Sequence, residues 1–257
     1  MRKLRPANLP VVIVRPSIVS ASIKEPFPGW TDTLSAAGGL SLAAGTGVLG
    51  YVFGKYENIA DIIPVDYVSN AVIVSTAMCA NKPELTVVHA STSYRNPVTW
   101  GDFCNIGFGY LTTQPASIQV FKPNLGFIYN KRLLKTMFFL QSQLPVMALD
   151  QISKLPIIGT PALKKNVQEL KFVNTKINDM YELFSHFTRN SWIYESKKLL
   201  EYTALMSPEE RETFFVDVKT FTWEAATHLY GFGIEKFIFG EDKVEPDGKS
   251  MMLLNKN

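Results

Sequence analysis

The stretch LPVVIVRPSIVSASIKEPFPGW, from Leu9 to Trp30, decides the fold that the sequence predicts. Its first part, Pro10 to Val14, is a β-branched apolar run that is too short for a stable helix. The run is also too continuously apolar for a half-exposed strand, so it predicts a buried parallel strand.

The residues that follow this strand are the first candidates for a binding site. Ligands of open α/β sheets lie beyond the carboxyl ends of the strands, where Arg15, Pro16 and Ser17 stand. Because Pro16 has no N–H, we expect the amides of Ser17 and Ile18 to face a ligand. An ordinary exit from strand to loop is the alternative. Glu25, just after the strand end, could contact a polar substrate group or be a solvated turn residue.

The composition indicates a globular protein. The chain has 257 residues, of which 46% are hydrophobic and 19% charged, enough for one large domain or two small ones. A net charge of +3 without a basic run argues against a nucleic-acid partner. Two cysteines, Cys79 and Cys104, without metal-ligand spacing predict a reduced, intracellular compartment and no zinc site.

Two apolar stretches are long enough to be tested as membrane segments. Residues 36–54 are uncharged but rich in glycine, which predicts a loop. Residues 133–152 are interrupted by polar residues and a proline, so we expect no transmembrane helix, although a peripheral membrane face remains open. The sequence also shows no signal peptide and no C-terminal peroxisomal tripeptide.

The first 120 residues alternate strand and helix, as a parallel sheet requires. An apolar run at 59–65 leads to a predicted helix at 66–78, for which Asp66 is the expected N-cap. Residues 85–90 predict a strand, and Thr99 with Asp102 predicts the capped start of a helix that continues to Gly107.

From about Val120 onward we expect no further strands. Residues 167–187 have the periodicity of one amphipathic helix, Ser207 and Glu210 form a capping-box pattern, and Thr222 starts the last predicted helix. The expected organisation is a sheet domain at 1–120, a linker at 121–164, a helical domain at 165–245 and a tail at 246–257.

Several literal motif matches compete as catalytic or cofactor sites. Residues 45–50 match the dinucleotide fingerprint G-x-G-x-x-G, but the preceding residues form a poor strand, so a glycine loop is the preferred interpretation. Tyr51 with Lys55, and Tyr194 with Lys198, have the Tyr-x-x-x-Lys spacing in which a lysine lowers the pKa of a phenol. Neither pair follows a strand–helix pattern, and the three histidines are isolated, so we assign no catalytic residue.

Several segments, taken in order, resemble the alcohol-forming fatty acyl-CoA reductases, which belong to the extended short-chain dehydrogenase group. Three of them match the distal half of the reductase domain: VVIVRPSIVSASIKEPFPGW (11–30), IADIIPVDYVSNAVI (59–73) and NPVTWGDF (96–103). The others match the region after it: LPVMALD (144–150), FTRNSWIYESKKL (187–199), LMSPEER (205–211), FFVDVKTFTW (214–223) and IEKFIFGED (234–242).

The resemblance implies the distal part of a Rossmann-like α/β domain followed by an all-helical C-terminal domain. The implied reaction is NADPH-dependent reduction of a long-chain acyl-CoA through a bound aldehyde to a fatty alcohol. Pro16, Ser17 and Ile18 would line the nicotinamide end of the cofactor pocket. Glu25, Pro26, Phe27 and Trp30 would border the acyl substrate. The family also implies a peroxisomal or endoplasmic-reticulum membrane surface.

This sequence departs from the family pattern before residue 9, where the family has its phosphate loop and catalytic Tyr-x-x-x-Lys. We therefore expect the chain alone to be inactive, with an exposed sheet edge that another chain could complete. Two interpretations stay open. The chain is an enzyme fragment, or it is a non-catalytic binding or scaffold subunit of a larger assembly.

Overall fold

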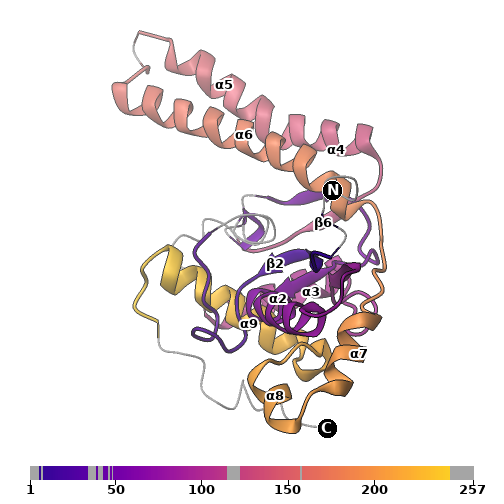
Figure 1. The fold of residues 1–257 in the computed structure, drawn as a ribbon. Helices are drawn as coiled ribbons and strands as arrows, with labels where there is room; N and C mark the ends of the chain where they lie inside the picture. The colour runs from indigo at the N-terminus through magenta and orange to yellow at the C-terminus, as the bar shows by residue number, and fades with distance from the viewer. Residues whose placement is uncertain are drawn as a thin grey trace.

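The fold is described from a computed structural model that covers residues 6, 8–33, 39, 43–45, 47, 49–114, 122–156 and 158–243 (Figure 1). Its sheet pieces are parallel, as predicted. Strand β1 (Val11–Pro16) pairs with β5 (Leu85–Ala90), and β2 (Ile18–Ser20) pairs with β4 (Ile62–Pro64). The expected full burial of the first strand is wrong, because β1 has only one neighbouring strand among the described residues and its residues 11–14 are half-buried.

Two helices complete the first part of the chain, α2 (Val65–Cys79) and α3 (Trp100–Thr113). The α3 cap is as predicted, since the Thr99 hydroxyl accepts from the Asp102 amide, but the helix continues well past Gly107. The α2 cap is not. Pro64 is its N-cap and makes no side-chain bond, while Asp66 lies in the first turn and its carboxylate binds another loop.

The expectation of no strand after about Val120 is wrong. Strand β6 (Gly126–Ile128) pairs in parallel with β3 (Tyr51–Phe53), so this segment contributes to a sheet piece of the first part. A long helical hairpin follows: α4 (Lys131–Phe138), a π-helical segment (Phe139–Gln143) and α5 (Leu144–Ser153) pack against α6 (Pro161–Thr188). The hairpin projects away from the rest of the molecule in Figure 1. The proposed domain boundaries stay a prediction.

The last part of the chain is helical, as predicted. It contains α7 (Lys197–Leu205), α8 (Pro208–Thr213), a 3₁₀ turn (Val218–Thr220), α9 (Trp223–Gly233) and a π-helical segment (Ile234–Ile238). The predicted capping box of α8 is present, because Ser207 and Glu210 bond reciprocally.

The helices at the C-terminal end share both hydrophobic cores with the sheet. Tyr67 and Val88 pack in one core with Phe215, Phe221 and Leu229. In the other, Trp100 and Phe103 pack with Tyr230 and Ile234. The two halves of the sequence therefore stabilise each other. No helix in the described part of the chain has the length and apolar character to cross a membrane.

Candidate functional site

The largest described cleft, about 840 Å³, opens along the strand segment that joins β1 to β2. One wall consists of five consecutive residues, 15–19. Because alternate side chains of a strand point to opposite faces, a wall of consecutive residues indicates that the cleft runs along a strand edge. A second wall comes from the end of α6 and the segment after it, with His186, Phe187, Trp192 and Tyr194. The predicted cofactor residues Pro16, Ser17 and Ile18 therefore line the largest described cavity.

The expectation that the amides of Ser17 and Ile18 face a ligand is wrong. The Ser17 N–H donates to the Ala90 carbonyl at 3.0 Å, and the Ile18 N–H donates to the Asp61 carbonyl at 3.1 Å. These bonds are needed because the chain passes here from pairing with β5 to pairing with β4. The Ser17 hydroxyl, by contrast, is buried and has no hydrogen-bond partner among the residues that the structure describes. A buried polar group without a partner is unfavourable in the free protein, so this hydroxyl is the group that could bind a ligand.

Asp61 organises the floor of the cleft. This residue is 9% exposed, and its Oδ1 accepts from the Thr92 amide, the Thr92 hydroxyl and the Ser93 amide at 3.0, 3.1 and 3.3 Å. Its Oδ2 accepts from the Ser93 hydroxyl at 2.7 Å. A carboxylate with four donors is well satisfied, so it fixes the turn that follows β5.

The same turn holds the second wall in place. Ser93 Oγ accepts from the Tyr194 amide and Ser91 Oγ donates to the Tyr194 carbonyl, both at 3.0 Å. The Tyr194 ring lies 5.8 Å from that of His89, and the His186 ring lies 5.0 Å from that of Trp192. The wall is thus largely aromatic, and such surfaces can pack against planar rings or apolar chains.

The predicted substrate residues lie elsewhere, on the loop after β2. None of Glu25, Pro26, Phe27 and Trp30 lines the cleft, and the first three are exposed. The loop packs on α9: Gly29 has a positive φ of 76°, and a Cβ there would lie 2.5 Å from the Leu229 carbonyl. Their role as substrate-binding residues stays a prediction.

Asp66 fixes the start of this loop. Its Oδ2 accepts from the amides of Ile23, Lys24 and Glu25 at 3.0, 2.8 and 3.3 Å. Burial raises the pKa of the Asp66 carboxyl, and the three amide bonds offset part of that rise. The carboxylate therefore positions the loop rather than capping its own helix.

The literal motif matches are not assembled as catalytic pairs. Residues 45–50 lie partly outside the described residues. Tyr51 belongs to β3, and the ammonium group of Lys55 lies 4.7 Å from the Tyr129 ring centroid. Tyr194 does line the cleft, but it precedes α7 in a non-helical segment, so Lys198 is not placed beside it by helical spacing.

The sequence interpretation missed the floor and the aromatic wall of the cleft. One signal was available for Asp61, because this acid interrupts the apolar run at 59–65. His89 and His186 carried no local signal, since they reach the cleft from positions 97 residues apart.

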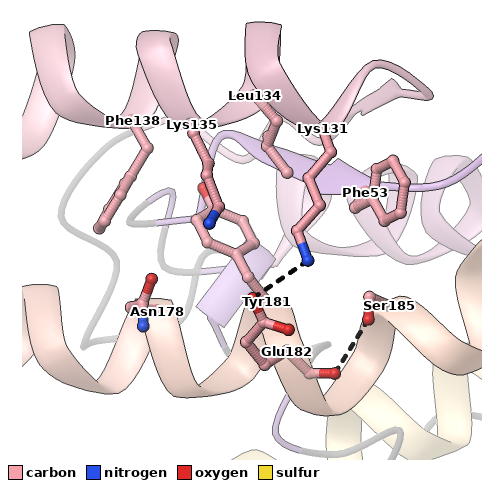
Figure 2. A pocket seen from close by; sticks show the side chains of 9 residues that line it. All are labelled: Phe53, Lys131, Leu134, Lys135, Phe138, Asn178, Tyr181, Glu182 and Ser185. Atoms are coloured by element: carbon pink, nitrogen blue, oxygen red, sulfur yellow. Dashed lines mark hydrogen bonds and ion pairs between the residues drawn. The ribbon is translucent and has the colours of Figure 1, made fainter.

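A second, much smaller cavity of about 30 Å³ lies between α4 and α6 (Figure 2). Phe53, Leu134, Phe138 and Tyr181 form its apolar walls, and Lys131 pairs with Glu182 across its mouth at 3.5 Å. A space of this size holds about one water molecule, so it is no substrate site.

Comparisons with known proteins agree with the resemblance in the sequence. Two family models, both described as male sterility protein, match this chain: the NAD-binding model at residues 1–72 and a second model at residues 143–241. The chain is 32% identical over 247 residues to rat (Rattus norvegicus) fatty acyl-CoA reductase 1 and 30% identical over 239 residues to that of Xenopus laevis. Fatty acyl-CoA reductase 2 of Mus musculus is 30% identical over 240 residues.

These similarities extend over most of this chain but not over the whole of the relatives. The first two matches cover 92% of the chain and 45% of each relative, and the mouse match covers 91% and 44%. The chain thus spans a little under half the length of the curated relatives it matches.

Proposed function

Because the chain belongs to the family of the fatty acyl-CoA reductases, we propose that its cleft is part of a site that reduces a long-chain acyl-CoA to a fatty alcohol. Each reaction would consume one thioester, two molecules of NADPH and two protons. It would release one alcohol, the free thiol of CoA and two NADP⁺, with the aldehyde held between the two reductions. NADPH, when bound, supplies the hydride.

The observation that carries this proposal is the buried Ser17 hydroxyl in a cleft of about 840 Å³. The cleft has room for the nicotinamide end of a dinucleotide, and Ser17 can donate to or accept from a polar group of that ring. Pro16, whose φ is fixed, and Ile18 would hold the ring against the strand edge. The residues present therefore fit the proposed cofactor.

The aromatic wall would hold the apolar part of the substrate. Phe187, Trp192 and Tyr194 line the same cleft as residues 15–19, so a thioester bound against them would lie near the nicotinamide. An acyl chain that continued past β2 would reach the loop of Glu25, Pro26, Phe27 and Trp30. Phe27 is 55% exposed and is the largest apolar surface that this loop offers.

The proton donor and the phosphate cradle would come from further chain at the open edge of β1. Only β5 pairs with β1 among the described residues, so the other edge can accept a strand. A second strand-bearing polypeptide could fill the same place, in which case this chain would act as a binding subunit. We place the reaction at an intracellular membrane surface, peroxisomal or of the endoplasmic reticulum, where long-chain acyl-CoA esters partition.

The test is the Ser17→Ala variant, assayed in the full product of the gene. The Michaelis constant for NADPH should rise about three- to tenfold, the effect of one lost hydrogen bond, with palmitoyl-CoA as substrate. The matched control is Ser69→Ala, an exposed serine on α2 whose hydroxyl donates to the Val65 carbonyl of its own helix. Failure of the full gene product to form fatty alcohol would refute the proposal.

A further inference from the structure

The outer face of the α4–α5 arm carries an apolar surface. Four large apolar side chains that lie close together along the arm are exposed to solvent: Phe139 by 41%, Leu140 by 54%, Leu144 by 44% and Met147 by 55%. Scattered exposed apolar residues are ordinary, but four large ones on two successive turns form a patch. We call these four residues the arm patch.

The arm patch does not belong to the interface between α4–α5 and α6, because other apolar side chains already fill that interface. Leu134, Phe138 and Val146 are buried on the inner side of the arm, facing α6. Asn174 of α6 donates to the Ser142 carbonyl, and Lys171 pairs with Asp150 at 2.7 Å. The hairpin is therefore held without the arm patch, which faces away from α6.

Charges frame the arm patch but are absent from it. No residue from Thr136 to Leu149 is charged. Lys131, Arg132 and Lys135 precede this interval, and Asp150 follows it, paired with Lys154. The whole hairpin, residues 131–188, has eight Lys or Arg and four Asp or Glu, a net charge of +4. The entire chain has a net charge of only +3, so the rest of the molecule is slightly acidic.

One of the framing charges is available for a partner. Lys131 and Lys154 pair with Glu182 and Asp150, and Lys135 lines the cavity between α4 and α6 (Figure 2), but Arg132 forms no ion pair with any residue that the structure describes. An apolar face with basic residues at its ends is the pattern of a helix that lies in the plane of an anionic bilayer. The arm from Lys131 to Ser153 would extend roughly 35 Å along such a surface.

We propose that the α4–α5 arm is a membrane-docking element, which inserts the arm patch into the interfacial region of an anionic bilayer while Arg132 contacts lipid headgroups. The hairpin projects from the rest of the molecule, so the arm can meet a surface without obstruction from the sheet (Figure 1). Docking here would hold the protein at a bilayer that contains acyl-CoA. Only the role of docking in giving access to acyl-CoA rests on the proposed function, because membrane binding itself does not depend on catalysis.

The test is flotation of the whole chain with vesicles of phosphatidylcholine alone or with phosphatidylserine added. Wild-type protein should float with the anionic vesicles and lose binding at high salt. The variant Leu140→Glu/Leu144→Glu should bind at least about tenfold more weakly, because two apolar side chains no longer enter the bilayer. Arg132→Gln should weaken binding about fivefold.

The matched control is Leu205→Glu, a leucine that is 71% exposed at the end of α7, outside the hairpin. It should float like wild type, and all variants should keep the wild-type circular dichroism spectrum. Equal vesicle binding by wild type and the double-leucine variant would overturn the proposal. A wild-type dimer that the double-leucine variant dissociates, without vesicle binding, would also overturn it and make the arm patch a contact between two copies. Vesicle binding needs no turnover, so failure here leaves the proposed reductase function untouched.

Discussion

Removing the Asp61 carboxylate should destabilise the protein strongly, whereas replacing it by an amide should not. In Asp61→Ala the amides of Thr92 and Ser93 lose their acceptor, while the two hydroxyls can rotate toward other partners. Each orphaned buried amide costs about 1–2 kcal/mol, so the free energy of unfolding should fall by about 2–4 kcal/mol. This is a large share of the stability of a typical domain, about 5–15 kcal/mol.

Asp61→Asn separates hydrogen bonding from charge. Three of the four donors bind Oδ1, which an asparagine retains, and only the Ser93 hydroxyl at Oδ2 must change its partner. We expect a loss of about 1 kcal/mol. If the charge itself held the turn, the two variants would lose similar amounts.

Urea unfolding followed by tryptophan fluorescence measures this difference, because Trp100 and Trp192 line the same cleft. With a slope of about 2 kcal/mol per molar urea, the midpoint of Asp61→Ala should fall by about 1–2 M. Asp179→Ala, at an exposed position on α6, is the control and should stay within about 0.5 kcal/mol of wild type. Equal losses in Asp61→Ala and Asp61→Asn, or a loss below about 1 kcal/mol in Asp61→Ala, would show that hydrogen bonds to Asp61 do not stabilise this turn.

Three further predictions concern the loop, the helices and the isolated chain. Burial raises the pKa of the Asp66 carboxyl, so folding favours its neutral form. The unfolding free energy of wild type should therefore fall relative to that of Asp66→Asn as pH rises from about 3 to 7. A constant difference between the two unfolding free energies would contradict this. Gly233→Ala would place a Cβ 1.7 Å from the Gly29 carbonyl oxygen and should lower stability by about 2 kcal/mol or more, whereas Gly109→Ala has open space and should raise it by about 1 kcal/mol in urea unfolding. The 257-residue chain alone should oxidise no NADPH in the presence of palmitoyl-CoA, and acyl-CoA-dependent loss of absorbance at the NADPH band would show otherwise.

Local patterns predicted most of the elements, because their causes lie within a few residues. The β-branched run before Arg15, the capping box at Ser207 and Glu210 and the periodicity of α6 all depend on neighbours along the chain. Strand β6 was not predicted, because a strand of three residues is too short to show the alternation of apolar and polar residues. Its existence depends on pairing with β3, 75 residues earlier.

Asp66 shows why a local pattern can assign the wrong role. An acid just ahead of an apolar helical run is typical of an N-cap, and position alone favoured that interpretation. In the structure its carboxylate instead accepts hydrogen bonds from the amides of residues 23–25, which lie more than 40 residues away along the chain. Such a contact depends on how the loop folds over the start of α2, which no local spacing encodes.

The cleft was predictable only on one side. The strand end at Pro16, Ser17 and Ile18 follows from the general position of ligands in α/β sheets. The floor at Asp61 and the wall at Trp192 and Tyr194 come from distant segments, brought together by the Ser91 and Ser93 hydroxyls. Even at the strand end the expectation was only partly right, because the Ser17 and Ile18 amides bond within the sheet, and the Ser17 hydroxyl is the polar group left without a partner among the described residues.

The most direct test of the central claim is the dissociation constant of NADPH for wild type and Ser17→Ala, measured together with the melting temperature of each. Since the Ser17 hydroxyl has no partner in the described structure, its removal should leave the melting temperature unchanged or raise it. The same removal should raise the dissociation constant about three- to tenfold. A lower melting temperature with an unchanged dissociation constant would contradict the account, because Ser17 would then support the fold rather than the cofactor.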